Sequence, residues 1–314
     1  MQFSIPPMPT FDRASASPTG NLSMKPAPIG YVIITPVRDE EKFVEGTIKA
    51  VIGQTVRPME WVIVDDGSTD HTGEIIDDYA SRIPWIHAVH RKNRGHRKSG
   101  GGVIEAFYDG YNALQNRSWD FVVKLDGDLT FAHDYFEKIF NRFDEQQDLG
   151  VAGGIISNAV DGTLRLEAGP RFHVRGATKI YRRQCWEAIE GLHLAPGWDT
   201  IDEVKANMFG WRSQTFPELQ LQQHRPTGTA DGWWKDRAKN GRAYYVAGYH
   251  PLFFAAKFFY RMSKPPYVVG AVAMGCGFLS GYFGAAKRIN DPRLVKYLRH
   301  QQINRLLGRK TVWR

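Results

Sequence analysis

Short runs of apolar residues alternate with helical patterns over the first half of the chain, and this alternation constrains the fold most. Each run is rich in β-branched residues and too short for a buried helix, which is typical of strands in a parallel sheet. The runs cover Tyr31–Thr35, Trp61–Asp65, Ile86–His90, Phe121–Leu125 and Val151–Ile156. Between them, apolar residues recur at helical spacing, for example from Val103 to Leu114. The pattern predicts an α/β fold with a doubly wound, mostly parallel sheet and right-handed crossovers.

Carboxylates follow three of these runs at the point where each predicted strand ends. The first strand leads into Arg38–Glu41, the second into Asp65–Asp70, and the fourth into Asp126-Gly127-Asp128. Ligands of such sheets bind beyond the carboxyl ends of the strands. Carboxylates gathered at one edge repel each other unless a cation or a hydrogen-bonding ligand lies among them. A nucleotide with a divalent ion would supply both.

At these residues the sequence resembles the family 2 glycosyltransferases, which are inverting enzymes with the GT-A fold. The resemblance covers roughly residues 29–245 and follows the family's order of motifs. These motifs are TPVRDEE from Thr35, VDDGSTD from Val64, KLDGD from Lys124 and a downstream acidic segment. The resemblance implies a Rossmann-like GT-A domain that transfers a sugar from a nucleotide diphosphate donor.

The resemblance also implies which residues bind the donor. Thr35, Pro36 and Glu40 belong to the first strand end, and Asp66 would bind the base or ribose, where a carboxylate could accept a hydrogen bond from a uracil imide. A tight turn that caps the next helix would explain the Asp65–Ser68 motif equally well. Hard oxygen ligands suit Mg²⁺ or Mn²⁺, so we expect Asp128 to bind the metal, and Asp126 to reach the ribose or a metal-bound water.

A basic, glycine-containing segment, residues 90–102, lies where the family has a flexible donor-binding stretch. Glycines and a helix N-terminus can face phosphate oxygens, and we predict donor contacts from Arg94 and Lys98, with Arg97 a weaker candidate. Farther along, Arg225 would contact the diphosphate. Trp233 and Trp234 could stack on an acceptor sugar or pack at the edge of the domain.

The acceptor hydroxyl needs a general base, and Asp199 is the first candidate. Counted from Asp199, Lys205 falls at +6 and Gly210-Trp211 at +11 and +12, a spacing that resembles the Glu-Asp segment of processive synthases. Trp198 stands where the family has Glu. Asp202 lies one helical turn on and is the alternative base, although an acidic first helical turn would also suit the helix dipole.

The end of the chain has a different composition. Residues 246–314 contain twelve Lys and Arg against one acidic residue, a net charge of +11, whereas the rest of the chain carries −3. Tyr267–Ala286 is twenty residues without a charge, and cations flank it. Because a single span would leave the basic end outside, we expect apolar and amphipathic helices in an interfacial or re-entrant arrangement on anionic headgroups.

These patterns predict three segments: a flexible leader (1–28), a glycosyltransferase domain (29–245) and a membrane-associated helical tail (246–314). The two cysteines are far apart, which argues against a zinc site or a disulfide framework. We expect the chain at the cytoplasmic face of a membrane, such as a bacterial inner membrane. There it would use a lipid-linked or polysaccharide acceptor, with a membrane protein as a further possible partner, and would not bind nucleic acid.

Three other functions can be weighed against this prediction. A nucleotidyltransferase that makes nucleotide sugars would need a glycine-rich phosphate loop after the first strand, and a dinucleotide-dependent oxidoreductase would need G-x-G-x-x-G there; TPVRDEE supplies neither. A non-catalytic membrane scaffold could retain the fold, but the complete set of carboxylates argues against it.

Overall fold

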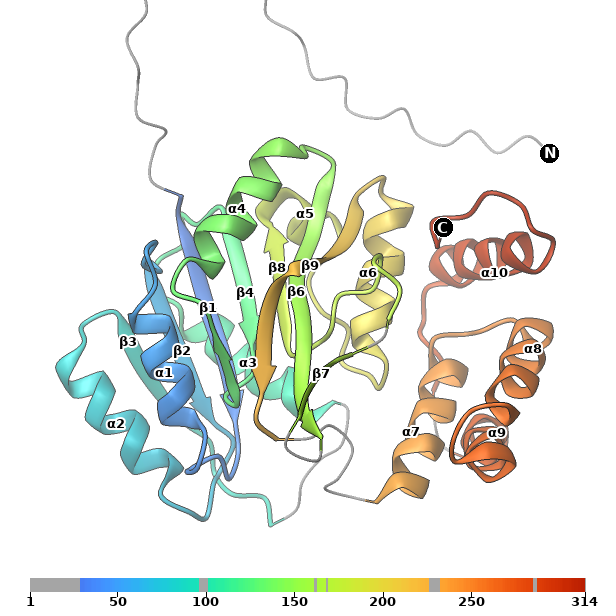
Figure 1. The fold of residues 1–314 in the computed structure, drawn as a ribbon, viewed down its shortest axis with the longest axis horizontal. Coiled ribbons are helices and arrows are strands. Elements are labelled where there is room, and N and C mark those ends of the chain that lie inside the picture. Colours follow the sequence, from blue (N-terminus) through green and yellow to red (C-terminus); the bar gives the residue numbers. More distant parts are fainter. Residues whose placement is uncertain are drawn as a thin grey trace, which may run out of the picture.

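The computed structural model describes residues 29–95, 101–160, 163–167, 169–225, 232–284 and 287–313. The predicted leader lies outside them. One sheet runs through the molecule in the order β3-β2-β1-β4-β8-β6-β9-β5, and β7 pairs with β6 at its margin (Figure 1). The strands are β1 (Tyr31–Val37), β2 (Glu60–Asp65), β3 (Ile86–His90), β4 (Phe121–Leu125), β5 (Leu129–Phe131), β6 (Leu149–Val160), β7 (Thr163–Leu166), β8 (Thr178–Arg182) and β9 (Arg212–Gln223).

The first four strands in that order are parallel, which confirms the predicted α/β fold. The other half is mixed. Strand β8 is antiparallel to both β4 and β6, so it separates two strands that the sequence suggested as members of one parallel series. Strand β6 then pairs in parallel with β9. The sheet is therefore mostly parallel, with an antiparallel insertion next to the central strand β4.

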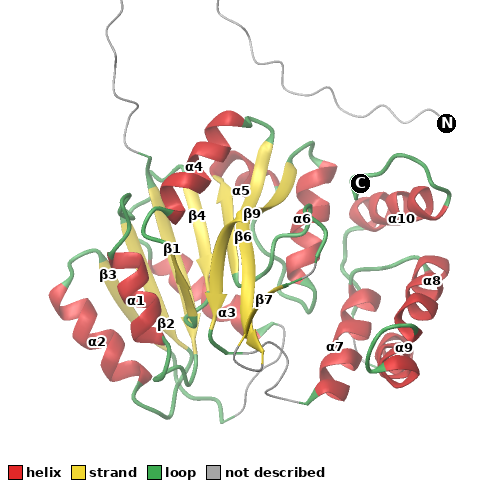
Figure 2. Cartoon of the chain, viewed as in Figure 1, coloured by secondary structure: helices red, strands yellow, loops and turns green. Residues whose placement is uncertain are grey.

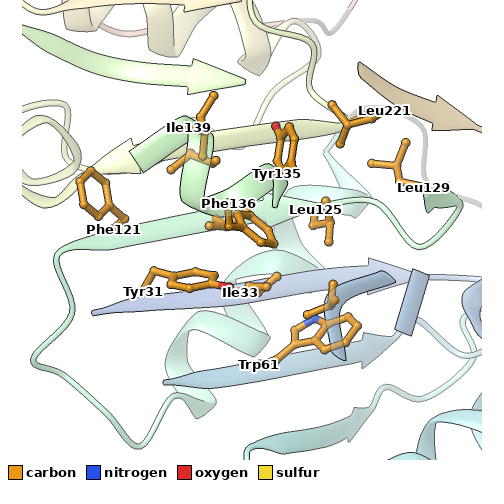
Figure 3. Close-up of a cluster of buried hydrophobic side chains, with 14 of the residues drawn as sticks. Tyr31, Ile33, Trp61, Phe121, Leu125, Leu129, Tyr135, Phe136, Ile139 and Leu221 are labelled. Atoms are coloured by element: carbon orange, nitrogen blue, oxygen red, sulfur yellow. The ribbon is translucent and has the colours of Figure 1, made fainter. Parts of the chain in front are cut away.

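Helices cover both faces of the sheet (Figure 2). On one face, β1 and β2 pack against α1 (Val44–Ile52), α2 (Thr72–Arg82) and α4 (Tyr135–Glu145). On the other face lie α3 (Gly102–Ala113), α5 (Arg183–Ala188) and α6 (Trp198–Met208). Helix α4 forms because Phe136, Ile139, Phe140 and Phe143 recur at one-turn spacing and are all buried. Figure 3 shows part of this core around Tyr31, whose ring centre lies 4.9 Å from that of Phe136.

Strand register brings the three acidic motifs to one edge. Val37 at the end of β1 is opposite Asp65 at the end of β2, and the amide of Asp66 donates to the carbonyl of Val37 at 2.8 Å. On the other side of β1, Ile34 is opposite Lys124 of β4. Gly127 follows β4 and packs so closely on Val37 that a side chain at this position would overlap it. The glycine of the D-G-D motif thus lets the two strand ends meet.

Four helices follow the sheet and share a separate core: α7 (Trp233–Val246), α8 (Pro251–Met262), α9 (Tyr267–Phe283) and α10 (Pro292–Leu306). They lie together on one side of the sheet (Figure 1), and their core includes Ile201 and Val204 of α6. Helix α7, of which all but the last residue falls within the predicted 29–245 segment, packs along α9. Within the described part of the chain, none of the helices combines the length and the apolar character needed to cross a bilayer.

Candidate functional site

The D-G-D turn holds two carboxylates with different surroundings. Asp128 is 4% exposed and accepts hydrogen bonds from Gln223 Nε2 at 3.1 Å and from the backbone amide of Arg225 at 3.3 Å. Burial, reinforced by the charge of Asp126, raises the pKa of Asp128 to about 6. Asp126 is more exposed and forms an ion pair with Lys124. The pair of carboxylates beyond one strand end therefore combines a buried member with an accessible one.

These two carboxylates suit a divalent ion that is shared with a ligand. Among the described residues, no group of three or more His, Cys, Asp or Glu side chains could hold a metal by itself. Mg²⁺ commonly takes only one or two protein carboxylates and completes its shell with water and phosphate oxygens. Asp128, with Asp126 beside it, offers hard oxygen ligands of this kind.

Asp66 is occupied by arginines of the loop that follows β3. Arg91 and Arg94 each form an ion pair with one of its carboxylate oxygens. Arg94 also lies 3.3 Å from Glu105 of α3, and Arg91 lies 2.7 Å from Asp109. The predicted base-binding carboxylate and one predicted phosphate-binding arginine are thus neighbours. The sequence reasoning missed Arg91, although it belongs to the same basic segment. Lys98 and Arg97 lie outside the described residues.

The first strand end carries the remaining predicted donor residues. Thr35 is fully buried, and its hydroxyl accepts a hydrogen bond from Trp61 Nε1 at 2.9 Å, so this side chain stabilises the sheet. Pro36 is buried in β1. Glu40 pairs with Arg225 at 3.1 Å, and the same guanidinium donates to the carbonyl of Asp39. Because Arg225 follows β9, this pair closes one side of the D-G-D turn.

The two candidate bases on α6 differ sharply. Asp202 has a fully buried side chain, which accepts from Lys179 Nζ at 2.9 Å and from the Tyr181 hydroxyl at 2.5 Å. Asp199 is partly exposed and makes no ion pair or side-chain hydrogen bond within the described part of the chain. Its Cβ lies near Gly176, whose carbonyl accepts from Lys124 at 2.6 Å. Gly176 therefore lies next to both Asp199 and the Lys124–Asp126 ion pair.

Lys179 holds the start of α6 in place from within the sheet. This lysine of β8 is fully buried and contacts Asp202, Glu203 at 3.0 Å and the carbonyl of Asp199 at 2.5 Å. On the far side of Glu203, His173 lies at 3.0 Å, and the charge of Glu203 raises the pKa of His173. The network pairs two cations with two carboxylates when His173 is protonated. The sequence did not identify Lys179 as a site residue. The signal that could have done so is a lysine within a short run of residues typical of a strand.

Trp198, which stands where the resembled family has Glu, lies against both buried lysines. The ammonium groups of Lys124 and Lys179 are each 5.6 Å from the centre of its ring. The electron-rich ring face is a favourable neighbour for a cation. This position therefore connects the lysine that binds Asp126 to the lysine that anchors α6.

Comparisons with known proteins agree with this architecture. Residues 32–193, a little over half of the chain, match the family "Glycosyl transferase family 2". An uncharacterized glycosyltransferase EpsJ of Bacillus subtilis is 32% identical over 121 residues, 38% of this chain and 32% of that protein. Polyprenol monophosphomannose synthase of Mycolicibacterium smegmatis is 25% identical over 146 residues, 41% of this chain and 53% of that one. The chain spans only 20–35% of the length of the first three curated relatives.

Two solved structures share the fold. The mannosyltransferase PcManGT of Pyrobaculum calidifontis, in complex with GDP-Man and Mn²⁺, has a TM-score of 0.52 and 15% identity, over 90% of this chain and 76% of that one. Residues 1–349 of S. aureus TarS with UDP-GlcNAc give a TM-score of 0.51 and 16% identity, over 88% and 81%. At such low identity these likenesses establish the fold alone. The family match, the strand-end motifs and the GT-A architecture together show that the chain belongs to the family 2 glycosyltransferases.

Proposed function

We propose that the protein transfers a sugar, with inversion, from a UDP- or GDP-linked donor to a lipid-linked or polysaccharide acceptor at the cytoplasmic face of a membrane. The observation that carries the proposal is the contrast between the two acids of α6. Asp202 is ion-paired and buried, whereas Asp199 is partly exposed beside Gly176, and the next residue, Ala177, accepts a hydrogen bond from the amide of Asp126 in the D-G-D turn. A general base must reach its substrate, and this favours Asp199.

In the proposed reaction, Asp199 takes the proton of the acceptor hydroxyl as its oxygen attacks the anomeric carbon from the face opposite the nucleotide. The bond to the nucleoside diphosphate breaks as the new glycosidic bond forms. A Mg²⁺ or Mn²⁺ ion held by Asp128 would neutralise charge on the leaving diphosphate. Lys124 keeps Asp126 oriented at the same turn, and the Glu40–Arg225 pair places a cation near it.

The donor contacts of Asp66 require a change of partners. Both of its oxygens are engaged by arginines, so a bound base or ribose would share or replace these ion pairs. Arg91 and Arg94 would then be available to the phosphates. The relatives named above include an enzyme whose name specifies a polyprenol monophosphomannose product, and this supports a lipid-linked acceptor as the first to test.

The test separates donor binding from transfer. Thermal shift with UDP-, GDP- and dTDP-sugars in the presence of Mn²⁺ identifies the donor, since a specific ligand raises apparent stability. We then expect Asp199→Asn to keep the donor-induced shift while losing at least about a hundredfold in transfer rate, the scale of general-base catalysis. Normal transfer by Asp199→Asn would reject this base. No stabilisation by any of these donors would reject the proposed function itself.

A further inference from the structure

Helix α9 has one face that is already buried against the protein. Gly277 lies directly on the carbonyl of Ala238 in α7, and Gly241 of α7 lies on the carbonyl of Met274; a side chain at either glycine would overlap backbone. Phe278 stacks on Phe254 of α8 at 3.8 Å. The glycines of this uncharged stretch therefore let two helix backbones meet within the fold.

The opposite face of α9 is exposed and apolar along the whole helix. We call it the α9 face: it consists of Val268, Val269, Val272, Cys276, Leu279 and Phe283, which recur at helical spacing. Leu279 is 55% exposed and Phe283 is 90% exposed. Helix α9 contains no charged residue. Single exposed apolar side chains are ordinary, but a continuous apolar helix face on a protein surface indicates a contact site.

Cations lie at both ends of helix α9. Arg261 and Lys264 precede the helix, and Lys287 and Arg288 follow it. Arg288 lies over the ring of Tyr245 in α7 at 4.6 Å and over that of Tyr282, at the end of α9, at 5.0 Å. An apolar helix face between groups of cations matches the interface of an anionic bilayer, where acyl chains lie beneath phosphate headgroups.

Charge also distinguishes a bilayer from a second copy of the chain. Residues 246–314 carry a net charge of +11, so two α9 faces in contact would bring two strongly cationic segments together, which opposes association. An anionic bilayer supplies the opposite charge. Leu252 and Tyr260 of α8, the helix that packs beside α9, are exposed as well.

We propose that the α9 face docks in the plane of an anionic phospholipid surface, with α7 holding the helix from the protein side. The proposal deepens the proposed function, since it names the surface that places the site at a membrane. It does not depend on catalysis: docking requires no donor, and transfer to a soluble acceptor analogue requires no docking.

The test is cosedimentation of the full chain with vesicles of phosphatidylcholine containing 30% phosphatidylglycerol, compared with pure phosphatidylcholine. We expect binding to the anionic vesicles and at least a tenfold loss of vesicle affinity in Leu279→Asp and in Phe283→Asp. Burial of a leucine-sized side chain is worth more than the ~1.4 kcal/mol that corresponds to a tenfold change. Leu166→Asp is the matched control, because Leu166 of β7 is 49% exposed and lies outside the α9 face.

The two cysteines allow a second measurement that needs no mutation. Cys276 is exposed on the α9 face, whereas Cys185 is buried and burial raises the pKa of its thiol, so a polarity-sensitive thiol dye should label Cys276. We expect a blue shift of its emission on anionic vesicles.

Equal binding by Leu279→Asp and wild type, or binding without a blue shift, would overturn the proposal. So would a dimer in light scattering that Leu279→Asp abolishes, because the face would then bind a second copy. Unchanged turnover of a soluble acceptor by Leu279→Asp would show that the catalytic proposal stands separately.

Discussion

Lys179→Met is expected to destabilise the protein severely although the lysine touches no solvent. The side chain is 0% exposed and its ammonium contacts Asp202 at 2.9 Å and Glu203 at 3.0 Å. Methionine fills a similar volume but leaves both carboxylates buried without this cation. Removal of one partner from a buried ion pair costs about 3–5 kcal/mol. Since domains are stable by about 5–15 kcal/mol, a large part of the stability would be lost.

The pH dependence of this loss has a definite sign. Burial raises the pKa of Asp202 even with Lys179 present, and loss of the lysine must raise it further. An acid whose pKa is raised in the folded state costs stability as pH rises from its unfolded pKa, about 4, through the folded one. The loss of stability caused by Lys179→Met should therefore be smaller at pH 5.5 than at pH 8.

Urea denaturation at the two pH values measures this difference. The double variant Lys179→Met/Asp202→Asn removes one buried charge while it keeps an acceptor for Tyr181, and it should recover part of the loss. Lys138→Met is the surface control, because its partner Asp134 lies at 2.7 Å but Lys138 is exposed. A Lys179→Met protein with wild-type stability, or a loss of stability that grows toward low pH, would contradict this prediction.

Three further predictions concern the metal, a histidine and the helix contact. Asp128→Ala should lose metal-dependent turnover while it stays folded by circular dichroism, and full activity of the wild type in EDTA would exclude the proposed metal role. Because Glu203 raises the pKa of His173, the histidine should stabilise the fold fully below about pH 6.5 and lose this effect as pH rises through its folded pKa. The difference in free energy of unfolding between wild type and His173→Gln should then shrink from pH 6 to pH 8.5; a constant difference would contradict this. Gly277→Ala should cost about 1–3 kcal/mol by overpacking against α7, whereas Cys276→Ala on the exposed face should melt like the wild type.

Prediction from sequence succeeded where local pattern and a general topological rule were enough. The apolar runs identify the parallel strands because each one is short, β-branched and followed by a helical stretch. Once those strands are parallel, their carboxyl ends must share an edge, and this predicts that Asp66, Asp126 and Asp128 lie in one region. The register of β1 with β2 and β4 agrees with that assignment.

The sequence alone thus determined the family, the parallel half of the sheet and the acidic edge, because short, contiguous sequence patterns specify all three. Tertiary structure decided what depends on partners distant in the chain. Strand β8 lies between β4 and β6 only through long-range pairing, and its buried lysine is tolerated only because α6 brings two carboxylates to it. The same contacts distinguish Asp202 from Asp199, two acids three residues apart that local sequence describes almost alike. Likewise, the glycines of α9 showed that helices could approach closely, but only the fold revealed that α7 is the helix they meet.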